Sequence, residues 1–71
     1  MAEQVRAEMV ANVFEVNVAP GDSVEAGQPL LVLESMKMEI PVVAESAGVV
    51  REVTVTPGTV VQEGDVLVVL E

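Results

Sequence analysis

Valine alternates with polar residues in two separate stretches of the chain. In the first stretch one polar residue separates Val16 from Val18, and in the second one polar residue separates Val53 from Val55. Side chains two residues apart along a strand point to the same face, so this pattern predicts half-buried β-strands. No helical periodicity competes with it.

A proline–glycine pair follows each alternating stretch, at Pro20–Gly21 and at Pro57–Gly58. Proline fixes φ and glycine accepts a positive φ, so each pair suits the two central positions of a type II turn. Gly27 and Gly64 predict a second turn in each stretch.

The second stretch is a repeat of the first. Sliding the chain by 37 residues places 42–71 over 5–34, and 15 of the 30 aligned pairs are identical. An internal repeat of this kind predicts architecture before any single element is assigned. The two copies and the connecting segment 35–41 account for a single domain over residues 1–71.

Each copy predicts about four strands. Short apolar runs at 29–34 and 66–71 are typical of buried strands, and the segments 5–10 and 42–48 complete each set. One four-stranded sheet of this length would leave its apolar face in water, so two sheets packed face to face are expected. The sequence therefore predicts an all-β sandwich of two four-stranded sheets with quasi-twofold symmetry.

Residues 35–41, SMKMEIP, belong to neither copy. A connection of this length, after a strand ending at Leu33–Glu34 and before one starting near Ile40, predicts a tight hairpin that projects into solvent. Lys37 would lie at its tip. Pseudo-symmetry would place both chain ends at the opposite pole.

Charge and composition exclude several functions. The net charge of −9, from 12 acidic and three basic residues, opposes binding to nucleic acid and to anionic membranes. Without cysteine or histidine, the chain lacks thiol nucleophiles, zinc-finger ligands and the usual general base near neutral pH. We expect no metal site and no catalytic residue. The first residues lack the basic and apolar regions of a signal peptide, so a cytoplasmic location is expected.

Lys37 is the only lysine, and it stands between Met36 and Met38. One interpretation is an ordinary solvated charge, with the methionines filling the core from both sides of the tip. The other is functional, because turns usually take Asn, Asp or Gly where this chain has methionine. In a strand-like tip, Met36 and Met38 would share a face opposite the amine.

The amine of Lys37 has no activating group in the sequence around it. Lysine is protonated at neutral pH and is a poor nucleophile unless desolvated or assisted by a neighbouring base or cation, and Glu34 and Glu39 would hold the proton on. Lys37 is therefore expected to be the substrate of another enzyme that recognises the folded hairpin.

The segment LLVLESMKMEIPV, with GDSVEAGQPL before it, resembles the biotinyl domain of biotin-dependent carboxylases. The hallmark of that family is Met-Lys-Met with biotin in amide linkage on the lysine. The resemblance covers essentially the whole chain and is greatest to the small free-standing biotinylated proteins of actinobacteria. It implies a flattened antiparallel β-barrel of two four-stranded sheets, with biotin covalently attached to Lys37.

The same resemblance implies roles for the flanking residues and for partner proteins. Met36 and Met38 would place the lysine, Glu34 and Ser35 would lie in the turn that faces the ligase, and Glu39 would complete the flanking set. A biotin protein ligase would use ATP to acylate the amine. The domain would then carry a carboxyl group between the biotin carboxylase and carboxyltransferase subunits of an acyl-CoA carboxylase. It would catalyse nothing itself and be a monomer in isolation.

The chain departs from the family at its first turn. Many relatives have Ala-Pro-Met-Pro-Gly where this chain has AEMVA, so the turn around Val10 and Ala11 is expected to differ in detail. A Pro/Ala-rich tether and a thumb-like insertion are also missing from the pattern.

Other functions remain open from the sequence. A lipoyl carrier for 2-oxoacid dehydrogenases shares the fold and the exposed lysine, although its family usually has Asp-Lys-Ala at this turn. A biotinylated protein without a carboxylase role is another alternative. An independent enzyme is least favoured, because single scattered acids specify no carboxylate pair and no phosphate loop is present.

Overall fold

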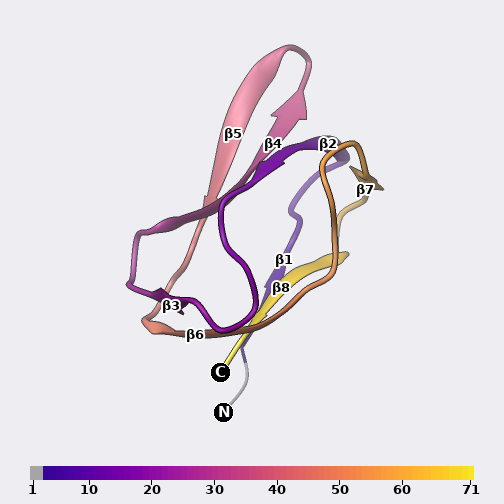
Figure 1. Cartoon of the computed structure of the whole chain (residues 1–71). Helices are drawn as coiled ribbons and strands as arrows, with labels where there is room; N and C mark the ends of the chain where they lie inside the picture. Colours follow the sequence, from indigo (N-terminus) through magenta and orange to yellow (C-terminus); the bar gives the residue numbers. More distant parts are fainter. Residues whose placement is uncertain (1–2) are drawn as a thin grey trace.

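Eight β-strands form two four-stranded antiparallel sheets in the computed structural model, which describes residues 3–71 (Figure 1). The strands are β1 (Glu3–Arg6), β2 (Ala11–Val16), β3 (Ser23–Val24), β4 (Pro29–Ser35), β5 (Met38–Val43), β6 (Gly48–Val53), β7 (Val60–Val61) and β8 (Val66–Leu70). One sheet has the order β1-β8-β6-β3 and the other has the order β5-β4-β2-β7. The predicted all-β, two-sheet fold is confirmed. Residues 1 and 2 of the predicted domain lie outside the described residues, and within 3–71 no helix is long and apolar enough to cross a membrane.

The core lies between the sheets and draws equally on both copies of the repeat. Fourteen of its fifteen buried residues form pairs that are 37 positions apart, such as Leu30 with Leu67, and the fifteenth, Ala11, corresponds to Gly48. Burying a Val or Leu side chain contributes about 1.5–3 kcal/mol. No polar side chain of the described residues is buried. Stability therefore rests on matched aliphatic packing.

The turns of each copy are held by the other copy. The amide of Gly27 donates to the carbonyl of Ala44 at 2.7 Å, and its repeat equivalent, the amide of Gly64, donates to the carbonyl of Ala7 at 2.8 Å. Each copy thus satisfies backbone groups of its partner copy. The predicted quasi-twofold symmetry is present at the level of individual hydrogen bonds.

Both predicted turns of each copy are found. An i to i+3 hydrogen bond closes the first, from the Asp22 amide to the Ala19 carbonyl at 3.1 Å, and a matching bond from Gln28 to Glu25 at 3.0 Å closes the second. The glycine at the third position of each turn has a positive φ, as a type II turn requires. These φ values are 97° for Gly21, 85° for Gly27, 95° for Gly58 and 92° for Gly64.

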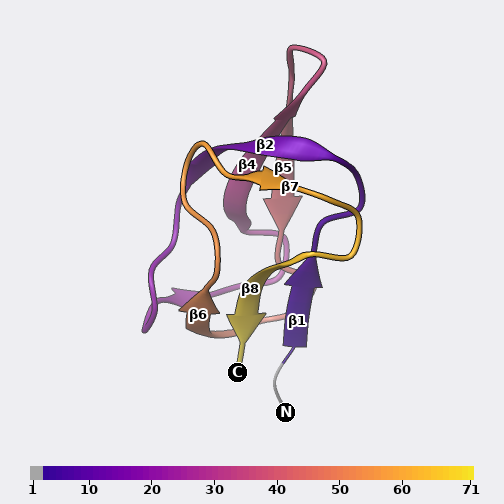
Figure 2. The same cartoon turned by 90° about the vertical axis from the view of Figure 1, so that its right-hand side faces the viewer.

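The β4–β5 hairpin and the chain ends occupy opposite poles. β4 and β5 correspond in the fold to β8 and β1, which pair with Glu3 opposite Leu70. In Figures 1 and 2 the hairpin projects from one pole and the C-terminus lies at the other. The predicted placement of the hairpin away from the chain ends is confirmed.

The first turn has an exposed and a buried part. Val10 is exposed, whereas Ala11 is buried and begins β2. Whether this turn differs from those of relatives stays a prediction.

The twofold equivalence of the turns has a measurable energetic consequence. A Cβ added at Gly27 or Gly64 would meet no atom within 4 Å, so an alanine there costs only the strain of a positive φ. We expect Gly27→Ala and Gly64→Ala each to lower the free energy of unfolding by about 1–2 kcal/mol. Urea unfolding followed by circular dichroism measures this. A difference above about 1 kcal/mol between the two variants would show that the turns are not energetically equivalent.

Candidate functional site

The hairpin tip is a two-residue turn. β4 and β5 stay paired up to Ser35 opposite Met38, so only Met36 and Lys37 connect them. Both have positive φ, 52° and 66°. Positive φ at both central residues is the geometry of a type I′ turn, whose twist matches that of the flanking strands.

The predicted seven-residue connection is therefore wrong in extent, although its position is right. β4 runs one residue beyond its expected end at Glu34, and β5 begins two residues before its expected start near Ile40, because the backbones stay paired up to Ser35 opposite Met38. The hairpin tip has Met36–Lys37 in place of the Asn-Gly or Asp-Gly that usually indicates a type I′ turn. Met36 and Lys37 occupy the left-handed region instead, where residues other than glycine are strained by roughly 1–2 kcal/mol each.

Neither methionine fills the core. Met36 is 89% exposed and Met38 is 60% exposed, so the core-filling interpretation is wrong. The expected shared face is wrong too, because Met36 lies in the turn whereas Met38 lies in β5 and alternates with Ile40 on one face of that strand. Two thioethers next to an exposed lysine stand in solvent at a cost to stability.

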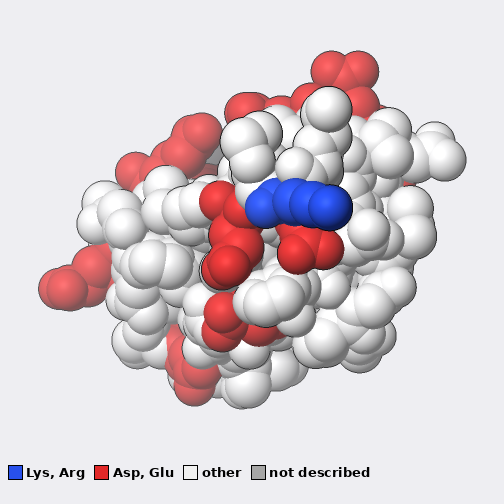
Figure 3. Space-filling model, turned by 90° about the horizontal axis from the view of Figure 1, so that it is seen from above, with Lys and Arg blue, Asp and Glu red and all other residues white. Residues whose placement is uncertain are grey.

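Acidic side chains gather just behind the tip. Glu34 of β4 lies directly opposite Glu39 of β5, and like charges in such a cross-strand pair destabilise a sheet. Glu34 is half-buried, as is Ser35, and Glu39 is exposed. Figure 3, which looks down on the tip, shows a blue cationic side chain bordered by red acidic ones. The structure thus brings all the predicted flanking residues together with Lys37.

The described residues contain no group of three or more His, Cys, Asp or Glu that could hold a metal ion. The chemistry available at the tip is that of one primary amine. It is accessible from most directions, on a hairpin whose projection gives the molecule its longest dimension of 32 Å.

A β-sandwich of two repeated halves with an exposed lysine on the hairpin that joins them defines a domain that carries a covalently attached group. The sequence profile of the family described as "Biotin-requiring enzyme", the biotin/lipoyl family, matches residues 3–70. The chain belongs to this family, and the resemblance seen in the sequence is confirmed.

Individual relatives agree with this assignment. A biotinylated protein TB7.3 homolog of Mycobacterium leprae is 61% identical over 49 residues, which cover 69% of each chain. A single-chain, multi-domain long-chain acyl-CoA carboxylase contains a region of 41% identity with a TM-score of 0.90 that covers 96% of this chain but 7% of that chain. The lipoyl domain of the 2-oxoglutarate dehydrogenase complex from Azotobacter vinelandii has 27% identity and a TM-score of 0.75, covering 87% of this chain and 78% of the other.

These similarities establish the class of the domain. It is a biotin carrier domain with a lipoyl-domain-like fold, and its cofactor is covalent biotin. Domains of this class carry a group and do not themselves catalyse a reaction. The chain spans about two thirds of the mycobacterial relative and a small fraction of the carboxylase, so the likeness extends to a carrier domain and not to a whole carboxylase.

The strain at the tip can be tested by relieving it. Asparagine adopts the left-handed region more readily than methionine does, so Met36→Asn should raise the free energy of unfolding by about 0.5–1 kcal/mol. Met38→Asn is the matched control in an ordinary strand position, where we expect no gain. Thermal and urea unfolding of both variants measure the difference. Equal effects in the two variants would contradict strain at Met36.

Proposed function

We propose that this domain accepts biotin on Lys37 from a biotin protein ligase and carries a carboxyl group for an acyl-CoA carboxylase. The observation that supports it most directly is the position of Lys37, the only lysine in the chain, at the tip of the projecting β4–β5 hairpin. Similarity to a carrier region of a long-chain acyl-CoA carboxylase supports the carboxylase role.

The residues at the tip fit amide-linked biotin. Attachment of biotin through a lysyl amide needs a side-chain primary amine, and Lys37 supplies the only one in the chain. Nζ would bond to the carbonyl carbon of biotinyl-adenylate, which the ligase makes from biotin and ATP, and the bond from that carbon to AMP would break, so that AMP leaves. Two protons would leave the ammonium nitrogen, and the formal charge of the chain would change from −9 to −10. When bound, biotin supplies a ureido nitrogen that carries a carboxyl group.

The rigid hairpin is what the ligase would recognise. β4 and β5 remain in register to Ser35 and Met38, so the turn has little freedom to present the amine in other ways. Met36 and Met38 offer apolar surface beside the amine, while Glu34 and Glu39 offer negative charge on the strands behind it. A ligase surface with an apolar patch and a basic rim would complement this tip.

The partner surfaces follow from the charge of the domain. A net charge of −9 favours docking on basic surfaces of the biotin carboxylase and carboxyltransferase subunits and accelerates their encounter at low salt. A monomeric state in isolation and a cytoplasmic location belong to the same proposal.

The attachment site is tested by replacing the lysine with a cation that cannot form the amide. Co-expressed with a biotin ligase, the wild-type chain should gain the mass of one biotinyl group, and Lys37→Arg should gain none. Lys37→Arg keeps the positive charge at position 37 and the α-amino group of the chain. Loss of biotin in this variant would therefore be due to loss of the side-chain amine alone. Biotin on the arginine variant, or none on the wild type, would refute the assignment of Lys37.

The carboxylase role needs a separate test. Biotinylated protein mixed with purified biotin carboxylase, ATP and labelled bicarbonate should acquire label, and a carboxyltransferase subunit with an acyl-CoA should remove it. The Lys37→Arg protein is the control and should stay unlabelled. No transfer of label with carboxylase subunits of the same source would favour a free-standing biotinylated protein, which similarity to the mycobacterial protein also supports.

Lipoylation is the remaining alternative. The lipoyl domain shares this fold, but its sequence identity of 27% is lower than the 61% of the biotinylated relative. Incubation with a lipoyl ligase and lipoate, followed by mass measurement, should give no adduct. A lipoyl adduct formed in preference to a biotinyl adduct would reverse the choice of cofactor.

A further inference from the structure

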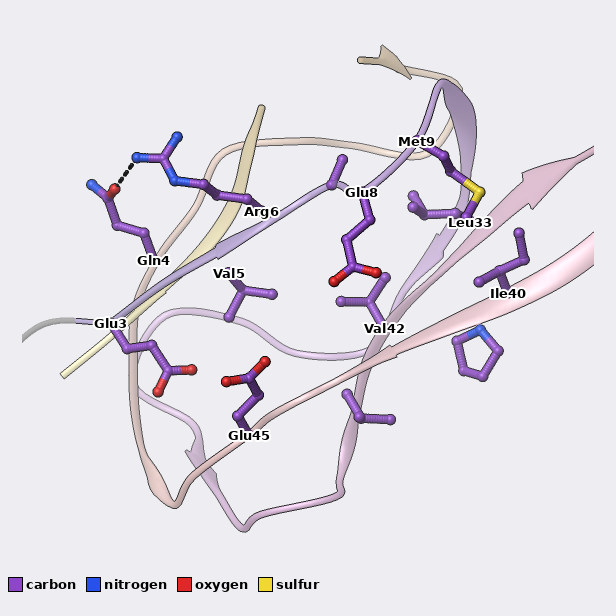
Figure 4. A pocket seen from close by; sticks show the side chains of 13 residues that line it. Glu3, Gln4, Val5, Arg6, Glu8, Met9, Leu33, Ile40, Val42 and Glu45 are labelled. Atoms are coloured by element: carbon purple, nitrogen blue, oxygen red, sulfur yellow. Dashed lines mark hydrogen bonds between the residues drawn. The ribbon is translucent and has the colours of Figure 1, made fainter. Parts of the chain in front are cut away.

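A groove of about 420 Å³ lies between β1 and β5, the edge strands of the two sheets (Figure 4). Its middle is formed by Val5 of β1 and Val42 of β5, which are repeat equivalents. The groove therefore straddles the quasi-twofold axis. One of its ends faces the Lys37 hairpin and the other faces the chain ends.

The two ends differ although the fold relates them. The end towards the hairpin is lined by Met9, Leu33 and Ile40, which Figure 4 shows grouped together. Ile40 pairs with Leu33 as Glu3 pairs with Leu70, so Glu3 is the structural counterpart of Ile40, and Ser46 is the repeat equivalent of Met9. The Ser46 hydroxyl donates to the Glu3 carboxylate at 2.7 Å. The same backbone arrangement thus forms with the polar pair Ser46 and Glu3 at one end. Folding therefore does not require the apolar pair Met9 and Ile40 at the other end.

Arg6 is the one basic residue that lines the groove. Its guanidinium donates to the Gly64 carbonyl at 2.8 Å and also to the Gln4 side chain. Figure 4 shows it directed away from Met9 and Ile40. Arg6 therefore does not cover Met9, Leu33 and Ile40, which form the apolar wall of the hairpin-side end.

The apolar wall continues from the groove to the turn that bears the lysine. Met38, Ile40 and Val42 alternate along β5 and so share one face of the strand. At about 3.3 Å per residue, Ile40 lies roughly 10 Å and Val42 roughly 16 Å along the strand from Lys37. A lysyl side chain extended by the pentanoyl chain of biotin spans roughly 13 Å at about 1.2 Å per bond. Such an arm ends between Ile40 and Val42.

We propose that the hairpin-side end of this groove is a resting site for the biotin carried on Lys37, an inference that rests on the proposed function. The pentanoyl chain packs along Met38 and Ile40, and the ring system lies against Met9 and Leu33. The carboxylate of Glu8, which Figure 4 shows over Val42, accepts a hydrogen bond from one ureido N–H group.

The chemistry of this end matches biotin better than a charged ligand. Apolar side chains form the wall, and one carboxylate at the far end of the reach supplies only acceptors. The ring system of biotin carries two N–H donors and one carbonyl acceptor on its ureido ring, and the rest of it is apolar. Docking it there covers exposed Met9 and Met38, which are 38% and 60% exposed, and removes apolar surface from water.

Ile40 gives a direct test, because it is the only isoleucine in the chain. Selective δ1-methyl labelling of the biotinylated protein yields one isoleucine signal. We expect that signal to shift on biotinylation and to show nuclear Overhauser effects to the biotin ring protons. In a second sample with labelled valine methyl groups, the exposed Val60 of β7 is the control and should show no such effects. Mass measurement first confirms that biotin is attached. Attached biotin without these effects overturns the resting site alone, whereas absence of biotin overturns the proposed function as well.

A repeat-swap variant tests the consequence for access. Met9→Ser with Ile40→Glu gives the hairpin-side end the residues that already fold at the other end. Capture of the attached biotin by streptavidin should become roughly 3- to 10-fold faster, because the arm is no longer held back. Val60→Glu, which adds the same charge at an exposed position of β7, is the control and should leave the rate unchanged. An unchanged rate in the repeat-swap variant, or an equal increase in the control, overturns the proposal.

Discussion

Neither copy of the repeat can bury its apolar face or pair its turn amides without the other, and the rest of the structure depends on this constraint. The amide of Gly21 bonds to the carbonyl of Val50, and the amide of Gly58 bonds to that of Val13, both at 2.8 Å. A copy alone would leave such groups unpaired against a wet aliphatic surface, which is unfavourable on both counts. The chain is therefore expected to fold as one cooperative unit despite its short length.

That cooperative core allows the hairpin to be locally unfavourable. Met36 and Lys37 adopt left-handed backbone, Glu34 opposes Glu39, and the thioethers lie in water. Each feature conflicts with stability, and such conflicts collect at functional sites, where surrounding structure overrides them. Here the stabilisation comes from the continuous pairing of β4 with β5 and from residues such as Leu33, whose side chain is buried in the core. The amine is thus presented rigidly without being buried.

The sequence predicted the fold well because two independent patterns agreed. Alternating valines located the half-buried strands, and the 37-residue repeat required two equal sheets and placed the hairpin opposite the chain ends. The turn itself was predicted with the wrong length, since Met36 and Lys37 are poor indicators of a type I′ turn. The groove was missed altogether. Leu33 and Ile40 are cross-strand partners in the β4–β5 hairpin, but Met9 lies in the segment between β1 and β2, and only the folded structure brings it beside them.

Internal symmetry separates what the fold needs from what the site needs. Where both copies keep similar side chains, as at Leu30 and Leu67, burial explains the choice. Where they differ without a change in the backbone, as Ile40 differs from Glu3, folding accepts either residue, so the choice must have another cause. The apolar pair, Met9 and Ile40, lies at the end of the groove that faces Lys37, and the polar pair, Ser46 and Glu3, lies at the opposite end. The exposed apolar residues that folding does not require therefore lie at the pole that bears Lys37.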